Sequence, residues 1–127
     1  MAIETTTTVR GQLPRIPYEK IADAVLGRHY ELSLVICGDT LSRRMNKKYR
    51  KKVYAPNVLS FPLAKNEGEI FLNLRCAERE AKLFDLPLHA RIAHLFVHGC
   101  CHLRGLPHGK KMDSLEKAVL KKFGFGQ

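Results

Sequence analysis

The stretch HLFVHGCCHLRGLPHG, residues 94–109, decides the fold and holds four of the chain's six histidines. Pro87 can open a helix, because proline fits the first helical turn, and Gly105 can end it near Leu103. Between residues 92 and 101 this helix is apolar on almost every side. A helix of that kind is surrounded by other elements. We therefore predict that it forms the buried centre of the domain.

Three histidines in this stretch have the spacing of a metal site. His98 and His102 lie one helical turn apart, about 6 Å between their Cβ atoms, so both imidazoles can reach one zinc ion at about 2.1 Å. Beyond the helix-ending Gly105, His108 can return to the same ion. Three histidines leave the fourth tetrahedral position to water, which is typical of catalytic rather than structural zinc. The alternative is that core and surface histidines fall close together by accident.

The neighbouring residues limit what such a site can do. His94 lies on the same face one turn earlier, but about 12 Å of helix rise separates it from His102, so we expect it to support a ligand or to pack. Cys100 and Cys101 could offer thiolates, yet both point away from the histidine face, which favours small buried hydrophobes. Gly99 stands where a zinc peptidase has its general-base glutamate. Peptide hydrolysis by that route is therefore not supported.

The chain is strongly basic. Its 22 Lys and Arg residues against 12 Asp and Glu give a formal net charge of +10, which favours phosphate-rich partners. Seven basic residues and no acid fall in RRMNKKYRKK, residues 43–52, together with Tyr49. The candidate RNA-binding residues are Arg43, Arg44, Lys47, Lys48, Lys51 and Lys52. A solvated helix face followed by a basic loop is the alternative interpretation.

Length and composition set the broad class. At 127 residues with 45% hydrophobic residues, the chain fits one domain, residues 1–127, with a real core. No apolar run reaches the roughly 18–20 residues of a membrane span, and the first ten residues lack the basic and apolar segments of a secretory signal. We therefore expect a cytoplasmic protein with no membrane partner, whose four cysteines are free thiols.

The predicted elements follow the order strand, helix, strand, helix, two strands and three helices. Their spans are residues 5–10, 17–28, 30–38, 39–49, 57–63, 69–74, 74–84, 87–103 and 112–124. Asp39 is expected to cap the second helix, Glu78 and Lys82 to pair across one turn, and a turn at 66–68 to join the two adjacent strands. Pro62 places the first of those strands at a sheet edge. The sequence predicts an α+β fold, in which a small mixed β-sheet of about four strands packs with about five helices.

Two motifs resemble those of a known family. HGCCHLRGLPH, residues 98–108, resembles the HGxLHLxGyDH signature of the YbeY-type endoribonucleases. MNKKYRKKVYAPNVLSFP, residues 45–62, is similar to that family's LNxxYRgkdkPTNVLSFP signature at the same internal spacing. GEIFLNL and AEREA, residues 68–74 and 77–81, resemble the family's GDIxI strand and its following helix. The resemblance covers roughly residues 30–124.

The resemblance implies a zinc-dependent, single-strand-specific endoribonuclease with one zinc ion per chain. It also implies a role in 3′-end maturation of small-subunit (16S) rRNA and in ribosome quality control, with single-stranded RNA, rRNA and the small ribosomal subunit as partners. By position, the matched zinc ligands are His98, His102 and His108. Arg50 matches the arginine implicated in RNA cleavage, and Asn57 and Ser60 fall in the motif that lines the cleft.

The chain departs from the family's pattern near the third histidine. Pro107 stands where the family commonly has aspartate, Ala55-Pro56 replaces Pro-Thr, and the acidic segment after His108 is shortened to GKKMDSLE. The first change removes a carboxylate that could hold a metal-binding histidine, but it removes no ligand. No obvious carboxylate base lies inside the motif. The nucleophile is therefore either a metal-activated water or the 2′-hydroxyl of the RNA.

The residues and the resemblance together predict one arrangement. Arg50 faces the metal across a cleft and neutralises charge that develops on the phosphate, while the basic run gathers the RNA backbone. Tyr49 or Tyr54 stacks an unpaired base, with a core position as the alternative for Tyr49. Two other functions stay open at this point: a non-catalytic ribosome-assembly factor with a structural zinc, and a hydrolase acting on another small substrate.

Overall fold

Four strands form one mixed sheet in the computed structural model, which describes residues 2–11 and 13–125. The strands are β1 (Ala2–Thr7), β2 (Glu31–Cys37), β3 (Val58–Ala64) and β4 (Glu67–Asn73), in the spatial order β1-β2-β4-β3. β1, β2 and β4 run parallel, whereas β3 is antiparallel to β4 and lies at the edge, as Pro62 predicts. The continuous apolar run in β2 reflects burial on both faces of the sheet.

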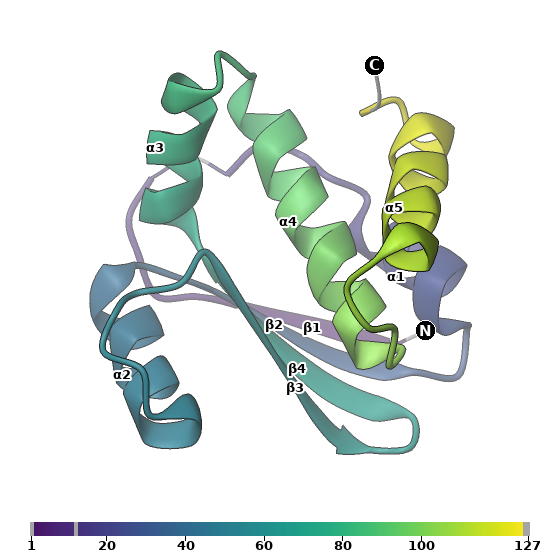
Figure 1. Cartoon of the computed structure of the whole chain (residues 1–127), viewed down its shortest axis with the longest axis horizontal. Coiled ribbons are helices and arrows are strands. Elements are labelled where there is room, and N and C mark those ends of the chain that lie inside the picture. Colours follow the sequence, from purple (N-terminus) through teal and green to yellow (C-terminus); the bar gives the residue numbers. More distant parts are fainter. Residues whose placement is uncertain (1, 12, 126–127) are drawn as a thin grey trace.

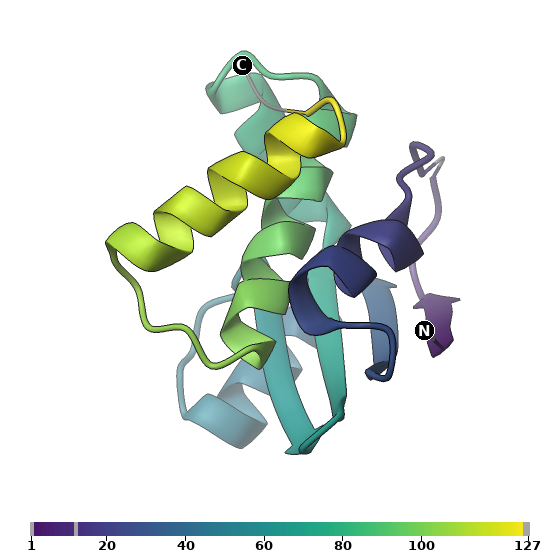
Figure 2. The same ribbon diagram turned by 90° about the vertical axis from the view of Figure 1, so that its right-hand side faces the viewer.

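Five helices complete the described part of the chain and confirm the predicted α+β fold. They are α1 (Tyr18–Leu26), α2 (Asp39–Arg50), α3 (Leu74–Leu83), α4 (Leu88–Leu103) and α5 (Lys110–Lys122). α2 covers one face of the sheet, and α4 lies over the other face among α1, α3 and α5 (Figure 1). α5 crosses α4 on its outer side (Figure 2). No helix among the described residues combines the length and apolarity that a membrane span requires.

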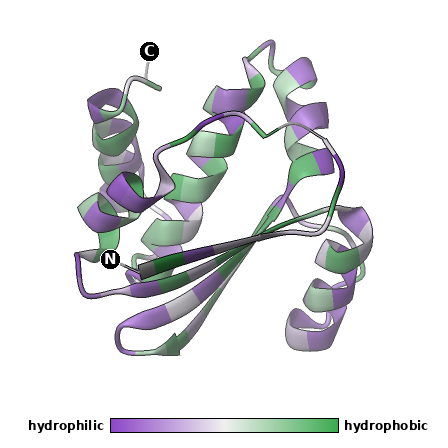
Figure 3. Cartoon of the chain, turned by 180° about the vertical axis from the view of Figure 1, so that it is seen from behind, coloured by the Kyte–Doolittle hydropathy of each residue, from purple (hydrophilic) through white to green (hydrophobic). Residues whose placement is uncertain are grey.

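The main core lies between the sheet and α4. Alternate residues of β2 and β4 face α4, namely Leu34, Ile36, Ile70 and Leu72, and all four are fully buried. Val35 and Phe71 face the opposite way and pack with Leu41 and Met45 of α2. Figure 3 shows the hydrophobic residues, in green, gathered along the strands and the helix faces that meet them. The prediction that the histidine-bearing helix is the buried centre of the domain is confirmed, since Phe96 and Val97 have no exposed surface.

The predicted N-cap role of Asp39 is wrong. Gly38 occupies the N-cap position, and Asp39 is the first residue of α2. Its carboxylate accepts two hydrogen bonds from Arg79, at 2.8 and 2.9 Å, and one from Asn73 at 2.9 Å. These donors draw the carboxylate away from the N–H groups of its own helix and lower its pKa to about 2. Asp39 therefore joins α2 to α3 instead of capping α2.

The predicted pair of Glu78 and Lys82 is also wrong. Glu78 accepts a hydrogen bond from Arg75 at 2.9 Å, one turn earlier in α3. Arg75 also donates to the carbonyl of Arg10 at 2.6 Å, so it is held on the side of the helix where Glu78 lies. This contact ties α3 to the segment that follows β1.

The first strand and the hairpin turn lie earlier in the chain than predicted, and the other strand ends differ by one or two residues. β1 covers Ala2–Thr7 rather than residues 5–10, because its register follows β2 from Glu31 to Ile36. The hairpin turn lies at residues 65–66, ahead of the predicted 66–68, because β4 already begins at Glu67. Gly68 continues the pairing beneath Tyr30 and Leu103, where a Cβ atom would collide with both side chains.

Candidate metal centre

α4 brings two imidazoles together on one face. The Nε2 atoms of His98 and His102 lie 3.0 Å apart, and their ring planes are nearly perpendicular at 87°. Two ligands of a tetrahedral zinc ion, each at about 2.1 Å from the metal, are about 3.4 Å apart. Both side chains are half-buried. The helix therefore presents its two histidines at nearly the separation that one small cation requires.

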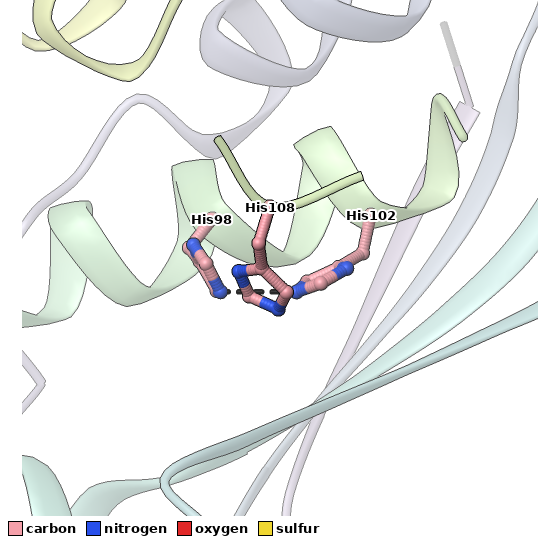
Figure 4. A group of neighbouring side chains, drawn as sticks. All are labelled: His98, His102 and His108. Carbon is pink, nitrogen blue, oxygen red and sulfur yellow. Dashed lines mark hydrogen bonds between the residues drawn. The ribbon is translucent and has the colours of Figure 1, made fainter. Parts of the chain in front are cut away.

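The turn after α4 returns His108 to this pair. Gly105 has a φ of 91°, and its N–H donates to the carbonyl of His102 at 2.9 Å, which ends the helix. The N–H of Leu106 then bonds to the carbonyl of Cys101 at 3.2 Å. His108 follows, and its ring centre lies 4.7 Å from that of His102 (Figure 4). The three potential ligand atoms lie within 4.8 Å of one another, so this cluster could hold a metal ion.

A buried carboxylate contacts the ring nitrogen of His98 that faces away from the histidine cluster. Glu116 of α5 is only 6% exposed, and its Oε2 lies 2.9 Å from Nδ1 of His98. With Nδ1 engaged in this way, Nε2 is the nitrogen that faces the cluster. Glu116 is a site residue that was not predicted from the sequence. The signal that could have identified it is its spacing from Met112 and Val119, which places a glutamate on the buried face of an amphipathic helix.

The surroundings of His102 favour its neutral form. Burial lowers the pKa of His102, and the neighbouring His98 and His108 lower it further. A neutral imidazole offers the lone pair that a metal needs. The donors therefore fit a cation such as zinc, which accepts neutral nitrogen ligands.

The two adjacent cysteines belong to the core, as predicted. Cys100 and Cys101 are fully buried on the side of α4 that faces the main core. Burial raises the pKa of Cys101 to about 11 and that of Cys100 well above its usual range, so both stay thiols. Within the described residues, the histidines at 98, 102 and 108 are the cluster that could hold a metal.

Gly99 has a packing reason to be glycine. A Cβ atom at this position would lie 3.1 Å from Oγ of Ser60 and 3.2 Å from a methyl group of Ile70. The side of α4 next to the first ligand therefore touches β3 and β4 directly. A glutamate at this position would require Ser60, Ile70 and Val58 to shift, which agrees with the argument against peptide hydrolysis.

The histidines open into a pocket of about 190 Å³ between α4 and the segment that joins α2 to β3. Its lining residues include Arg50, Tyr54, Asn57 and Ser60 together with the three histidines. Arg50 and the histidine cluster are thus brought to one pocket, as predicted. Asn57 and Ser60 also line it, as the resemblance implies.

Arg50 is held in place by β3. Its Nη2 donates to the carbonyl of Ser60 at 3.1 Å, and its guanidinium carbon lies 5.7 Å from the centre of the Phe61 ring. The hydroxyl of Ser60 in turn donates to the carbonyl of Gly99 on α4 at 2.9 Å. A short chain of contacts therefore links the arginine to the helix that carries the histidines.

The basic run divides between the pocket and the open surface. Arg50 lines the pocket, although its side chain is exposed as well. The other six, Arg43, Arg44, Lys47, Lys48, Lys51 and Lys52, are all exposed.

Two buried residues that were not predicted as functional fix the loop after α2. Ser42 donates to the carbonyl of Pro56 at 2.8 Å, and Asn46 donates to that of Tyr54 at 3.0 Å. Their polar side chains on the inner face of α2 are the signal that could have identified them.

The two tyrosines near the basic run are both at the surface. Tyr49 is 55% exposed and Tyr54 is 59% exposed, so the alternative of a core position for Tyr49 is wrong. Tyr49 lies 5.3 Å from the ring of Phe61. Tyr54 contributes to the pocket itself. Each presents an aromatic face beside the basic residues.

Fold and site together define an α+β protein in which three clustered histidines that could hold a metal ion share a pocket with an arginine. The family model described as Endoribonuclease YbeY matches residues 6–124. Endoribonuclease YbeY of Polynucleobacter asymbioticus is 40% identical over 103 residues, which cover 74% of this chain and 66% of that protein. Endoribonuclease YbeY of Chromobacterium violaceum is 33% identical over an alignment of 143 positions, covering 97% of this chain and 85% of that protein.

The solved structures agree on the fold. The solution structure of a Thermotoga maritima protein superposes with a TM-score of 0.68 at 19% identity, covering 95% of this chain and 88% of that one. The chain belongs to the Endoribonuclease YbeY family. Membership of this family supports an RNA-cleaving hydrolase, with the histidine cluster as its candidate metal site.

Proposed function

We propose that this chain is a zinc-dependent endoribonuclease that cleaves single-stranded RNA in one domain spanning residues 1–127. The observation that carries the proposal is the shared pocket, in which three convergent imidazoles and a fixed guanidinium line one cavity of about 190 Å³. Family membership supports the same reaction class.

The proposed metal ligands are His98, His102 and His108, holding one zinc ion per chain. Three nitrogen donors with one position left to solvent suit a catalytic zinc ion. Zinc bound there would polarise a phosphoryl oxygen or lower the pKa of a bound water. Glu116 supports this assignment, because its contact with Nδ1 of His98 leaves Nε2 for the ion.

Arg50 is the proposed catalytic residue. The Ser60 carbonyl and the Phe61 ring hold its side chain before any substrate binds. Its remaining N–H groups can donate to two phosphoryl oxygens at once, which suits a phosphate that gains charge in the transition state. A preorganised donor of this kind needs no rearrangement at the moment of reaction.

The exposed basic residues are the proposed RNA-binding surface. Arg43, Arg44, Lys47, Lys48, Lys51 and Lys52 add six exposed positive charges on α2 and the loop after it, and contacts with phosphate depend little on base sequence. Tyr54 at the pocket and Tyr49 on α2 can stack unpaired bases, whose faces a duplex would hide. This combination supports a preference for single strands.

We further propose that the natural substrate is small-subunit rRNA, cut near its 3′ end, with roles in ribosome quality control in the cytoplasm. The supporting observations are the net charge of +10 and the family. Binding to purified small subunits at near-physiological salt would test this partner separately from the chemistry.

The test of the reaction is cleavage of a labelled single-stranded RNA and of the same sequence as a duplex. Zinc-loaded protein should cut the single strand much faster, a chelator should stop it, and added zinc should restore it. Absence of cleavage by protein shown to hold its metal would contradict the proposal and favour an assembly factor with a structural zinc. Equal cleavage of both RNAs would contradict the preference for single strands.

A further inference from the structure

Glu116 is a charged group in an apolar setting. It lies on the face of α5 that also carries Met112 and Val119 into the core. Removing a carboxylate from water is costly unless the surrounding groups compensate it. The groups that do so are histidines, because Oε2 lies 2.9 Å from Nδ1 of His98 and Oε1 lies 3.4 Å from Nε2 of His94.

The position of each proton in this network follows from Arg91. A guanidinium can only donate hydrogen bonds. Nη1 of Arg91 lies 3.2 Å from Nδ1 of His94, so that nitrogen accepts, and the ring proton of neutral His94 is on Nε2, facing Glu116. Arg91 is itself fixed by Glu80, whose Oε1 accepts from Nε at 3.1 Å.

The contact with Glu116 also fixes the ring proton of His98. An ionised Glu116 only accepts, so Nδ1 of His98 carries the proton and donates to it. Nε2 of His98 then keeps a lone pair, and it points at the cluster, 3.0 Å from Nε2 of His102. Arg91 thus orients His94, whose Nε2 faces Oε1 of Glu116 at 3.4 Å, while His98 donates to the other oxygen of the same carboxylate.

We propose that Glu116 is a positioning residue, oriented by His94 and Arg91, that fixes His98 as the tautomer able to bind a metal through Nε2. This inference rests on the proposed function in that it takes His98 as a metal ligand. It gives His94 the role of orienting Glu116, without contact with the metal ion. It also explains why α5, which supplies none of the three clustered histidines, carries a buried glutamate against α4.

The first test is the zinc affinity of Glu116→Gln, measured by competition with a chromophoric chelator. Glutamine has nearly the same shape, but its side chain is neutral and only one of its two terminal atoms accepts hydrogen bonds. We expect zinc to bind about 10- to 100-fold more weakly, the usual effect of losing such a partner. Asp113→Asn is the matched control, because it removes an acid from the exposed side of the same helix. It should bind zinc like the wild type.

The second test reads the tautomers directly in metal-free protein, by long-range proton–nitrogen NMR of the histidine rings above neutral pH. Wild type should show His98 protonated on Nδ1 and His94 on Nε2, and in Glu116→Gln the His98 proton should no longer be confined to Nδ1. A His98 protonated on Nε2 in the wild type, or zinc affinity within twofold of wild type for Glu116→Gln, would overturn the inference. If wild-type protein binds no zinc, the proposed metal centre is wrong. The NMR measurement then still tests whether Glu116 fixes the tautomer of His98, because it uses metal-free protein.

Discussion

The two sides of the pocket are built in different ways. The histidine wall comprises His98, His102 and His108, on the central helix and the turn that ends it. The basic wall comprises Arg50 and the loop that leads to Ser60, and it continues outside the pocket into the exposed basic residues at 43–52. α4 is buried by the sheet and three other helices, whereas α2 presents most of its basic residues to solvent. Two residues of the histidine wall therefore stand on a core helix, whereas the basic wall stands on a surface helix and loop.

This difference separates what each wall can do. Side chains on a buried helix are held by packing, so α4 can keep the nitrogens of His98 and His102 at nearly the spacing a cation needs, and the turn after it adds the exposed His108. Charges on an exposed helix stay hydrated and reach outward, so the basic wall can attract a long polyanion. The contact of Ser60 with Gly99 is where the walls meet, and it fixes Arg50 relative to the histidines. Changes to the two walls should therefore have different consequences.

The largest effect is expected from His102→Ala in the histidine wall. Zinc should no longer bind in stoichiometric amount, and cleavage should fall to background. Metal binding stabilises the folded state, so zinc at 100 times its Kd should raise the free energy of unfolding of the wild type by about 2.7 kcal/mol. In His102→Ala this increase should disappear. Elemental analysis and thermal unfolding with and without zinc measure both effects. His89→Ala, an exposed histidine on the same helix, is the control, and an equal loss there would contradict the assignment.

The next effect concerns the chemistry of the basic wall. Arg50→Lys keeps a positive charge but loses the planar group that can hold two phosphoryl oxygens. Cleavage at saturating RNA should fall by roughly 10²–10³, with zinc content and thermal stability unchanged. Arg44→Lys, on the exposed part of the same helix, should cleave like the wild type. Equal rates for Arg50→Lys and wild type would remove Arg50 from the mechanism.

The histidine wall could be predicted from the sequence because it depends on local geometry. Helical periodicity sets the relation of His98 to His102, and Gly105 marks the return to His108. The same holds for the element order and for Pro62 at the sheet edge, where one residue's chemistry decides the outcome.

Partners far apart in the sequence could not be predicted in this way. Asp39 binds Arg79 across 40 positions, and Glu116 binds His98 across 18. Asp39 has a plausible local role as the cap of its own helix, and only its contact with α3 decides against it. Glu116 meets His98 only because α5 packs on α4. Loop anchors such as Asn46 are missed for the same reason.

The basic wall should respond to salt in proportion to its lost contacts. Lys47→Ala and Lys51→Ala should each weaken RNA binding similarly across sequences and reduce the slope of log K against log salt by about 0.7. Zinc affinity should not change, because neither residue lines the pocket. Lys20→Ala on α1, on the opposite face of the sheet, should leave the slope unaltered. If several substitutions in the run leave it unaltered too, the run is only a solvated face.

The smallest effect should come from the ion pair that anchors α2. Arg79 and Asn73 lower the pKa of Asp39 to about 2 from an ordinary 3.8, so the unfolded chain takes up this proton first as pH falls. The stability from the pair is then fully present above about pH 4 and is lost between about pH 4 and 2. Asp39→Asn should therefore lower Tm at pH 7, and this difference should shrink to near zero at about pH 2.

The size of that effect is limited by solvent. The side chains of Asp39 and Arg79 are 33% and 59% exposed, so we expect a change in Tm of at most a few degrees at pH 7. Thermal unfolding of wild type and variant across this pH range measures it, with Asp113→Asn on the surface of α5 as the control. A Tm difference that is the same at pH 7 and pH 2 would show that the ionised pair is not its cause. Asp39 lies at the first residue of α2, at the opposite end from Arg50, and its side chain bonds to Asn73 and Arg79. Within the described chain it contacts no residue of the histidine wall, so wild type and variant should bind zinc with equal affinity.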